Sequence, residues 1–121
     1  MSPCQRSLKM LRDSGWLVAV VERWNPHARL RQDLFGFGDL LAVKGNLVAL
    51  IQTTSGSNVS ARIAKIRANP SAAIWLGMGN ENRRIVVHGW RKAGPRGKRK
   101  TWQCRMVRLW PSGEADITEL I

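Results

Sequence analysis

Apolar runs of strand length alternate along this chain with stretches of helical pattern. Residues 2–13 begin with Ser-Pro, a common helix start, and place Leu8 and Leu11 on one stripe, which predicts a first helix. Residues 16–24 are rich in β-branched side chains and too few for a core helix, so they predict a buried strand. The polar and basic residues 25–33 predict a loop.

Two further apolar runs, 34–43 and 47–54, predict a hairpin. They are joined by Lys-Gly-Asn at 44–46, and Gly and Asn tolerate the positive φ that a tight turn needs, so we expect antiparallel pairing. Residues 55–58, Ser-Gly-Ser-Asn, then offer capping side chains to a helix expected over 59–68.

The rest of the chain predicts a short helix over 71–76 and a second hairpin, built from strands 85–92 and 101–109. The tip of this hairpin, 93–100, is long, basic and rich in Gly and Pro. The polar tail from Pro111 is expected to fray. The element order predicts an α+β fold, with a mixed central β-sheet flanked by helices.

Composition indicates one domain over residues 1–121, because a chain of this length with 44% hydrophobic residues can bury a single core. Cys4 and Cys104 form no CxxC pair, so free, half-buried thiols are expected. No apolar stretch has the length of a signal-peptide core or a membrane span. We therefore expect no membrane partner and a cytoplasmic protein, or one that a virus encodes and that acts there.

The charge balance points to a polyanionic partner. The chain has 20 Lys and Arg against 8 Asp and Glu, a formal net charge of +12, and half of the basic residues lie within 83–108, which holds no acid. This pattern predicts nucleic acid binding through the second hairpin. The alternative is a solvated basic surface without a partner. The expected contact residues are Arg91, Lys92, Arg96, Lys98, Arg99 and Lys100.

Trp90 and Trp102 flank this basic tip. Their indoles can stack on unpaired bases, and the alternative is that they pack against the sheet.

A second candidate site lies in the first hairpin. Asp39 stands at the head of one predicted strand and Gln52 at the end of its partner, and antiparallel pairing brings such ends together. Oxygen ligands of this kind suit Mg²⁺. The alternative is that Asp39 is only a turn residue beside Gly38.

Four short stretches carry a family resemblance: Gln5-Arg6-Ser7-Leu8, Gly15-Trp16, Gly38-Asp39-Leu40-Leu41-Ala42 and Gln52-Thr53-Thr54. Together they resemble the PD-(D/E)xK nuclease superfamily, in its small archaeal and phage Holliday-junction-resolvase-like branch. The resemblance implies an αβββαβ restriction-endonuclease-like core. It also implies an endonuclease that uses Mg²⁺, or Mn²⁺ in its place, cuts duplex or branched DNA and works as a homodimer.

Carried over by position, the resemblance assigns the metal to Asp39, Gln52 and the main-chain carbonyl of Thr53. Gln5 stands where the family has a helix Glu, and Thr54 where it has the catalytic Lys.

Two groups can fill these vacancies. Glu22 can serve as a replacement carboxylate, and the alternative is an exposed strand-end Glu paired to an Arg. Lys65 can serve as a replacement cation on the helix over 59–68. Arg62 would lie beside Lys65 on phosphate, and the alternative is that both are solvated helix residues. Asp33 and His27 lie in the preceding loop and can face the same site, and the amides of 55–58 can hold a phosphate.

Three hypotheses follow from the sequence. The first is a metal-dependent endodeoxyribonuclease in which Asp39, Gln52, Glu22 and Lys65 form the catalytic set. The second is a DNA-binding module of the same fold that has lost cleavage. The third, from a different class, is a small RNA-binding or ribosome-associated protein, which would explain the charge but not the pairing of Asp39 with Gln52.

Overall fold

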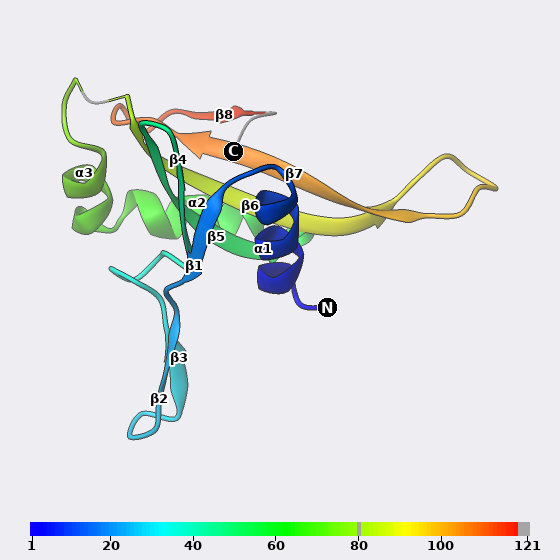
Figure 1. The fold of residues 1–121 in the computed structure, drawn as a ribbon, viewed down its shortest axis with the longest axis horizontal. Helices are drawn as coiled ribbons and strands as arrows, with labels where there is room; N and C mark the ends of the chain where they lie inside the picture. The colour runs from blue at the N-terminus through cyan, green and yellow to red at the C-terminus, as the bar shows by residue number, and fades with distance from the viewer. Residues whose placement is uncertain (80, 119–121) are drawn as a thin grey trace.

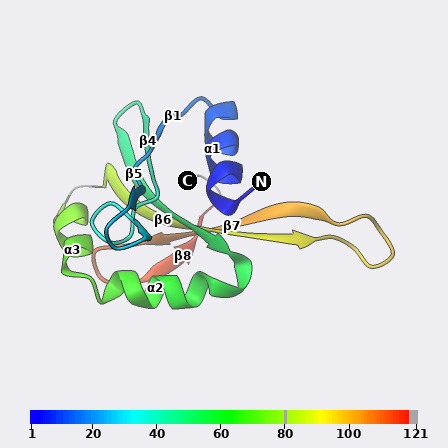
Figure 2. The same cartoon turned by 90° about the horizontal axis from the view of Figure 1, so that it is seen from below.

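The computed structural model describes residues 1–79 and 81–118. A six-stranded sheet lies between α1 on one face and α2 and α3 on the other, and a separate two-stranded hairpin, β2–β3, extends from the body (Figures 1 and 2). The elements are α1 (Pro3–Asp13), β1 (Leu17–Val20), β2 (Arg23–Asn25), β3 (Leu30–Gln32), β4 (Leu40–Lys44), β5 (Leu47–Ser55), η1 (Gly56–Asn58), α2 (Val59–Arg67), α3 (Pro70–Leu76), β6 (Arg83–Ala93), β7 (Thr101–Leu109) and β8 (Ala115–Ile117).

The main sheet has the strand order β1-β4-β5-β6-β7-β8 and is mixed. Among the strands of the described residues, only β5 and β6 pair in parallel, and α2 and α3 form the crossover between them. The other neighbours pair antiparallel, including the predicted β4–β5 and β6–β7 hairpins. The α+β fold class predicted from the sequence is therefore confirmed.

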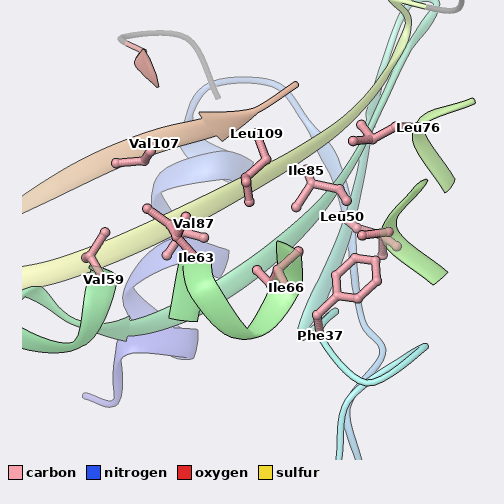
Figure 3. Packing of buried hydrophobic residues seen from close by; sticks show 11 residues of the cluster. Phe37, Leu50, Val59, Ile63, Ile66, Leu76, Ile85, Val87, Val107 and Leu109 are labelled. Carbon is pink, nitrogen blue, oxygen red and sulfur yellow. The ribbon is translucent and has the colours of Figure 1, made fainter. Parts of the chain in front are cut away.

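Each face of the sheet has its own apolar cluster. The cluster under α2 and α3 is drawn in Figure 3, and its largest members are Phe37, Leu50, Val59, Ile63, Ile66, Leu76, Ile85, Val87, Val107 and Leu109. The cluster under α1 comprises Leu11, Val18, Leu40, Ala42, Ala49, Ile51 and Val86. Since consecutive residues on β5 are fully buried against opposite helices, the centre of the sheet is covered on both faces, as a parallel pair requires.

A buried polar contact fixes α1 on the sheet. The Trp90 Nε1–H donates to Ser7 Oγ at 2.8 Å, and the same hydroxyl lies 2.9 Å from His88 Nδ1. Burial lowers the pKa of His88 to about 4, so the imidazole is neutral at pH 7, and its Nδ1 shares one hydrogen bond with the Ser7 hydroxyl. Trp90 is therefore half-buried, with its indole N–H held by α1.

The first half of the chain departs from the sequence prediction in three places. The run 16–24 is no single buried strand: β1 covers four residues at the sheet edge and buries only Val18. The expected loop 25–33 belongs instead to the β2–β3 hairpin. The run 34–43 becomes a strand only at Leu40, because 34–38 form a turn with positive φ at Phe35 and Gly36.

One smaller expectation was wrong: no side chain of 55–58 caps α2, and a 3₁₀ turn over Gly56–Asn58 leads into the helix instead. Within the tail that was expected to fray in part, Ala115–Ile117 form β8, which pairs with β7, and residues 119–121 lie outside the described part of the chain.

Gly89 allows the start of α2 to cross β6 closely. A Cβ atom added at Gly89 would overlap Val59 Cγ2 and lie 3.2 Å from Gly56 Cα. We predict that Gly89→Ala lowers the free energy of unfolding by about 1–3 kcal/mol, the usual cost of overpacking. Urea denaturation of Gly89→Ala, Val59→Ala and the double variant measures this. The double variant should be less destabilised than the sum of the single changes, and strict additivity would contradict the proposed overlap.

Candidate metal and nucleic-acid site

Asp39 is a buried carboxylate held by the β4–β5 hairpin. Its backbone N–H donates to the Ile51 carbonyl at 2.9 Å, one residue before β4 begins. Its Oδ2 accepts hydrogen bonds from the Thr53 backbone at 2.8 Å, from Thr53 Oγ1 at 3.0 Å and from Gln52 Nε2 at 2.9 Å. The side chain is only 3% exposed. Asp39 and Gln52 thus meet, as the predicted antiparallel pairing requires.

Two further carboxylates join Asp39 from the ends of the β2–β3 hairpin. Glu22 directly precedes β2 and Asp33 directly follows β3, and one oxygen from each of the three acids lies within 4.8 Å of the others. Gln52 Nε2 also lies 3.4 Å from Asp33 Oδ2, so one amide serves two acids. Clustered carboxylate oxygens are the ligands that Mg²⁺ and Ca²⁺ prefer, so this acidic cluster can hold a divalent cation.

The pKa of Asp39 lies well above its ordinary value. Burial raises the pKa of Asp39 to about 7, and hydrogen bonding and charge repulsion from Asp33 add to the rise. The hydrogen bonds from Thr53 act in the opposite direction, because they favour the ionised form. At neutral pH the carboxylate is therefore short of compensating positive charge.

A cavity of about 490 Å³ opens over the cluster and brings acids and bases together. Arg62 and Lys65 reach it from α2, whose buried side chains are Val59, Ile63 and Ile66. Arg31 also borders it, and its Nη1 lies 3.2 Å from Glu22 Oε1. The remaining lining residues are Ser2, Pro3, Cys4, Glu22, Asp33, Asp39, Gln52 and Thr53.

Three further positions considered from the sequence, Gln52, Thr53 and Gln5, make contacts other than those that the resemblance implies. Gln52 contacts Asp39 and Asp33 as a donor, so a metal contact through its oxygen would require the amide to turn over. Thr53 contacts Asp39 through its backbone N–H and hydroxyl. Gln5 completes a capping box with Ser2 on the exposed side of α1.

Two residues considered with the site do not line the cavity. Thr54, at the family's lysine position, is buried at 5% exposure. His27 is exposed in the turn of the β2–β3 hairpin, where its backbone N–H donates to Asn25 Oδ1.

The sequence did not identify Cys4 and Arg31 as residues of this cavity. Cys4 faces the cavity one position before Gln5, where the resemblance expects the helix acid. Burial raises the pKa of the Cys4 thiol to about 11, and the negative charges of Glu22 and Asp39 contribute, so the thiol stays protonated at neutral pH. For Arg31, the one indication in the sequence was its position two residues before Asp33, a residue already considered for the site.

The β6–β7 hairpin extends far beyond the body of the protein (Figure 1). Its basic side chains at the predicted contact positions are exposed, namely Arg91, Lys92, Arg96, Lys98, Arg99 and Lys100. Trp102, at the start of β7, is 44% exposed, with the Arg6 guanidinium 3.8 Å from its ring centre and Lys92 Nζ at 5.6 Å. One indole on this hairpin is thus already in contact with cations.

A second hollow lies where this hairpin meets the start of α2. It measures about 620 Å³ and shares no lining residue with the cavity over the acids. The lining residues are Ser55, Gly56, Ser57, Trp90, Arg91, Arg105 and Ile117. Residues 55–57 of the predicted phosphate-binding segment 55–58 therefore line a hollow with Arg91 and Arg105, and this hollow is separate from the cavity that holds the carboxylates.

Comparisons with protein-family models, curated proteins and solved structures give no match for this chain. The function of the chain is therefore inferred from the geometry and charges of this site. Among the described residues, no helix has the length and apolar character needed to cross a membrane.

The raised pKa of Asp39 has a measurable effect on stability. The folded state holds the Asp39 proton more tightly than the unfolded chain, so protonation stabilises the fold and this stabilisation is lost as pH rises from about 4 to about 7. Asp39→Asn cannot ionise and keeps an oxygen acceptor. We therefore predict that it unfolds at higher temperature than wild type at pH 8, and that this difference vanishes near pH 4.

Thermal unfolding followed by circular dichroism, without and with Mg²⁺, tests this prediction. Added Mg²⁺ should raise the midpoint of wild type at pH 8 and not that of Asp39→Asn, because ligands that bind only the folded state stabilise it. Asp13→Asn is the control, since Asp13 forms an exposed ion pair with Lys9 on α1. An Asp39→Asn midpoint below wild type at pH 8 would contradict the assigned charge imbalance.

Proposed function

We propose that this protein is a Mg²⁺-dependent endonuclease that acts on duplex or branched DNA, similar to Holliday junction resolvases. One observation carries the proposal: a single cavity holds Glu22, Asp33 and Asp39 next to Arg62 and Lys65. Hydrolysis of a phosphodiester needs both a cation site and positive groups around the phosphate.

The residues present fit a divalent cation. Three carboxylates converge, and Asp39 carries a raised pKa because its burial and its acidic neighbour are not compensated. A cation of two charges would relieve this imbalance, and Mg²⁺, with Mn²⁺ as a substitute, favours such oxygen ligands. When bound, Mg²⁺ supplies Lewis-acid stabilisation of the charge that develops on the phosphate.

The side chains of the protein would bind the cation, orient Asp39 and stabilise the charge on the phosphate. Glu22, Asp33 and Asp39 hold the ion, and Gln52 and Thr53 fix the orientation of Asp39 by hydrogen bonds. Lys65 takes the part of the family lysine and stabilises negative charge on the scissile phosphate, with Arg62 on a neighbouring oxygen. The β6–β7 hairpin binds the DNA backbone outside the cavity.

A catalytically inactive DNA-binding module of the same fold is the second candidate. It is favoured by Thr54, which is neutral and buried where the family lysine is expected, and by Gln52, which donates to the acids. An RNA-binding or ribosome-associated protein accounts for the basic hairpin and leaves the carboxylate cavity unexplained.

The proposal includes a homodimer, because two copies related by a two-fold axis would cut both strands of a symmetric DNA substrate. Light scattering of the free protein and of its complex with a four-way junction measures this. A monomer in both states would remove this part of the proposal and leave the cavity's chemistry intact.

Cleavage of a four-way junction and of a duplex in Mg²⁺ tests the active site. We predict that Asp39→Asn abolishes cleavage and keeps DNA affinity. Lys65→Ala should lower the single-turnover rate by ~10²-fold or more, as expected for a positioned catalytic group.

Lys9→Ala is the matched control, because Lys9 is exposed and pairs with Asp13 away from the cavity. Wild-type protein that binds these DNAs but cuts none in Mg²⁺ or Mn²⁺ would favour the binding module. A Lys65→Ala variant that cuts at the wild-type rate would exclude Lys65 from the mechanism.

Salt dependence of binding tests the role of the basic tip. Replacing Arg96, Lys98, Arg99 and Lys100 by Gln should reduce the slope of log K against log salt by up to about 3 to 4, since each phosphate contact contributes about 0.9. Exchanging Lys for Arg and Arg for Lys at the same positions keeps the charge and should keep the slope. An unchanged slope in the Gln variant would locate the DNA surface elsewhere.

A further inference from the structure

The β2–β3 hairpin extends from the body away from the β6–β7 tip (Figure 1). Residues 23–32 contain Arg23, Arg29 and Arg31 and no acid. Trp24 is 57% exposed although it is the largest apolar side chain of the hairpin. A two-stranded hairpin with an exposed indole gains little from its own packing, so its composition points to a ligand outside the chain.

The strand register aligns this indole with the cavity. Trp24 pairs with Arg31 across the hairpin, so the two side chains share a face. Glu22 stands two residues before Trp24 and Asp33 two residues after Arg31, so alternation directs both toward the same face. The ion pair between Arg31 and Glu22 agrees with this arrangement. One face of the hairpin thus runs from the indole through a guanidinium to two of the three carboxylates.

We propose that this hairpin binds an unpaired nucleotide beside the scissile phosphate, with Trp24 stacked on the base and Arg31 on the phosphate. The inference rests on the proposed function and narrows its substrate to DNA with unpaired or displaced nucleotides, such as forks and branched junctions. In a continuous duplex the faces of the bases are covered by their neighbours, so an indole on a protruding hairpin has nothing to stack on. An unpaired base offers that surface regardless of its sequence.

The distances support this placement. Two residues along a strand span about 7 Å, so the indole lies roughly one nucleotide from the carboxylates at the base of the hairpin. Arg31 can exchange Glu22 for a phosphate, because its side chain is largely exposed. The charges are complementary, since three arginines and no acid lie along the hairpin and the ligand is a polyanion.

Binding in EDTA separates this inference from cleavage. The probes are a fluorescein-labelled forked DNA with splayed single-stranded arms and a fully paired duplex of the same length. We expect wild type to prefer the fork, and Trp24→Ala to lower fork affinity about tenfold with duplex affinity nearly unchanged, since stacking on one base is worth about 1–3 kcal/mol. Trp24→Phe should keep most of the preference.

Leu30→Ala is the matched control, because Leu30 is an exposed apolar residue of the same hairpin but pairs with Asn25 on the opposite face. It should leave both affinities unchanged. As a second readout, 2-aminopurine at the unpaired position next to the fork point should be quenched by wild type and not by Trp24→Ala.

The outcomes distinguish this inference from the proposed function. Binding to neither probe would defeat both. Equal loss of fork and duplex affinity in Trp24→Ala, or an unchanged preference for the fork, would overturn the inference and leave the nuclease proposal standing. A dimer that dissociates in Trp24→Ala while the preference persists would assign the indole to a second copy of the chain, which also overturns it.

Discussion

The parallel pairing of β5 with β6 determines where the other elements lie. Both strands are buried on both faces, with Leu50 and Val87 under α2 and with Ile51 and Val86 under α1. The crossover through α2 and α3 follows from the parallel direction, because the chain must return to the same end of the sheet before β6 begins. At one edge of this core, Gln52 and Thr53 near the end of β5 contact Asp39, the residue that directly precedes β4.

The rigidity of that core gives the candidate site its geometry. Asp39 is buried because Ile51 accepts its backbone N–H and because Thr53 and Gln52 donate to its carboxylate. A carboxylate held in this way cannot move away from Asp33, so their repulsion is retained in the folded protein. Burial is the main cause of the raised pKa of Asp39, and the hydrogen bonding and charge of Asp33 add to it. Sites that keep such an unfavourable charge arrangement are commonly sites of ligand binding or catalysis.

The sequence predicts the scaffold of the site better than its periphery. The β4–β5 hairpin, the apolar stripe of α2 and the β6–β7 hairpin follow from apolar periodicity and turn residues. They bring together Asp39 and Gln52 on the sheet and place Lys65 on the adjoining helix flank. These elements are predictable because burial of apolar side chains forms them, and burial leaves a periodic pattern.

The β2–β3 hairpin and the position of Cys4 of α1 at the cavity could not be predicted from apolar periodicity. Residues 25–33 are polar and basic, since this hairpin buries almost nothing, so no alternation distinguishes it from a loop. The position of Cys4 in the cavity depends on the rotation of α1, which the contact of Ser7 with His88 and Trp90 fixes across more than 80 residues of sequence. Such long-range polar contacts leave no periodic signal.

On the proposed function, the substitutions at the family positions form one consistent change. A Glu at position 52 would add a fourth carboxylate to Glu22, Asp33 and Asp39, whereas the Gln52 amide donates to two of those acids and lowers their repulsion. The acids missing from α1 and β5 are thus supplied by the two ends of the β2–β3 hairpin.

On the same proposal, Lys65 and Arg62 on α2 and Arg31 on β3 would supply the positive charge that the resemblance places at position 54. Because Glu22, Arg31 and Asp33 all belong to the base of one hairpin, a ligand that moves this hairpin also moves two of the three carboxylates. On the proposed function, substrate binding and cation binding then act on the same backbone segment, so any effect of one on the affinity for the other is reciprocal.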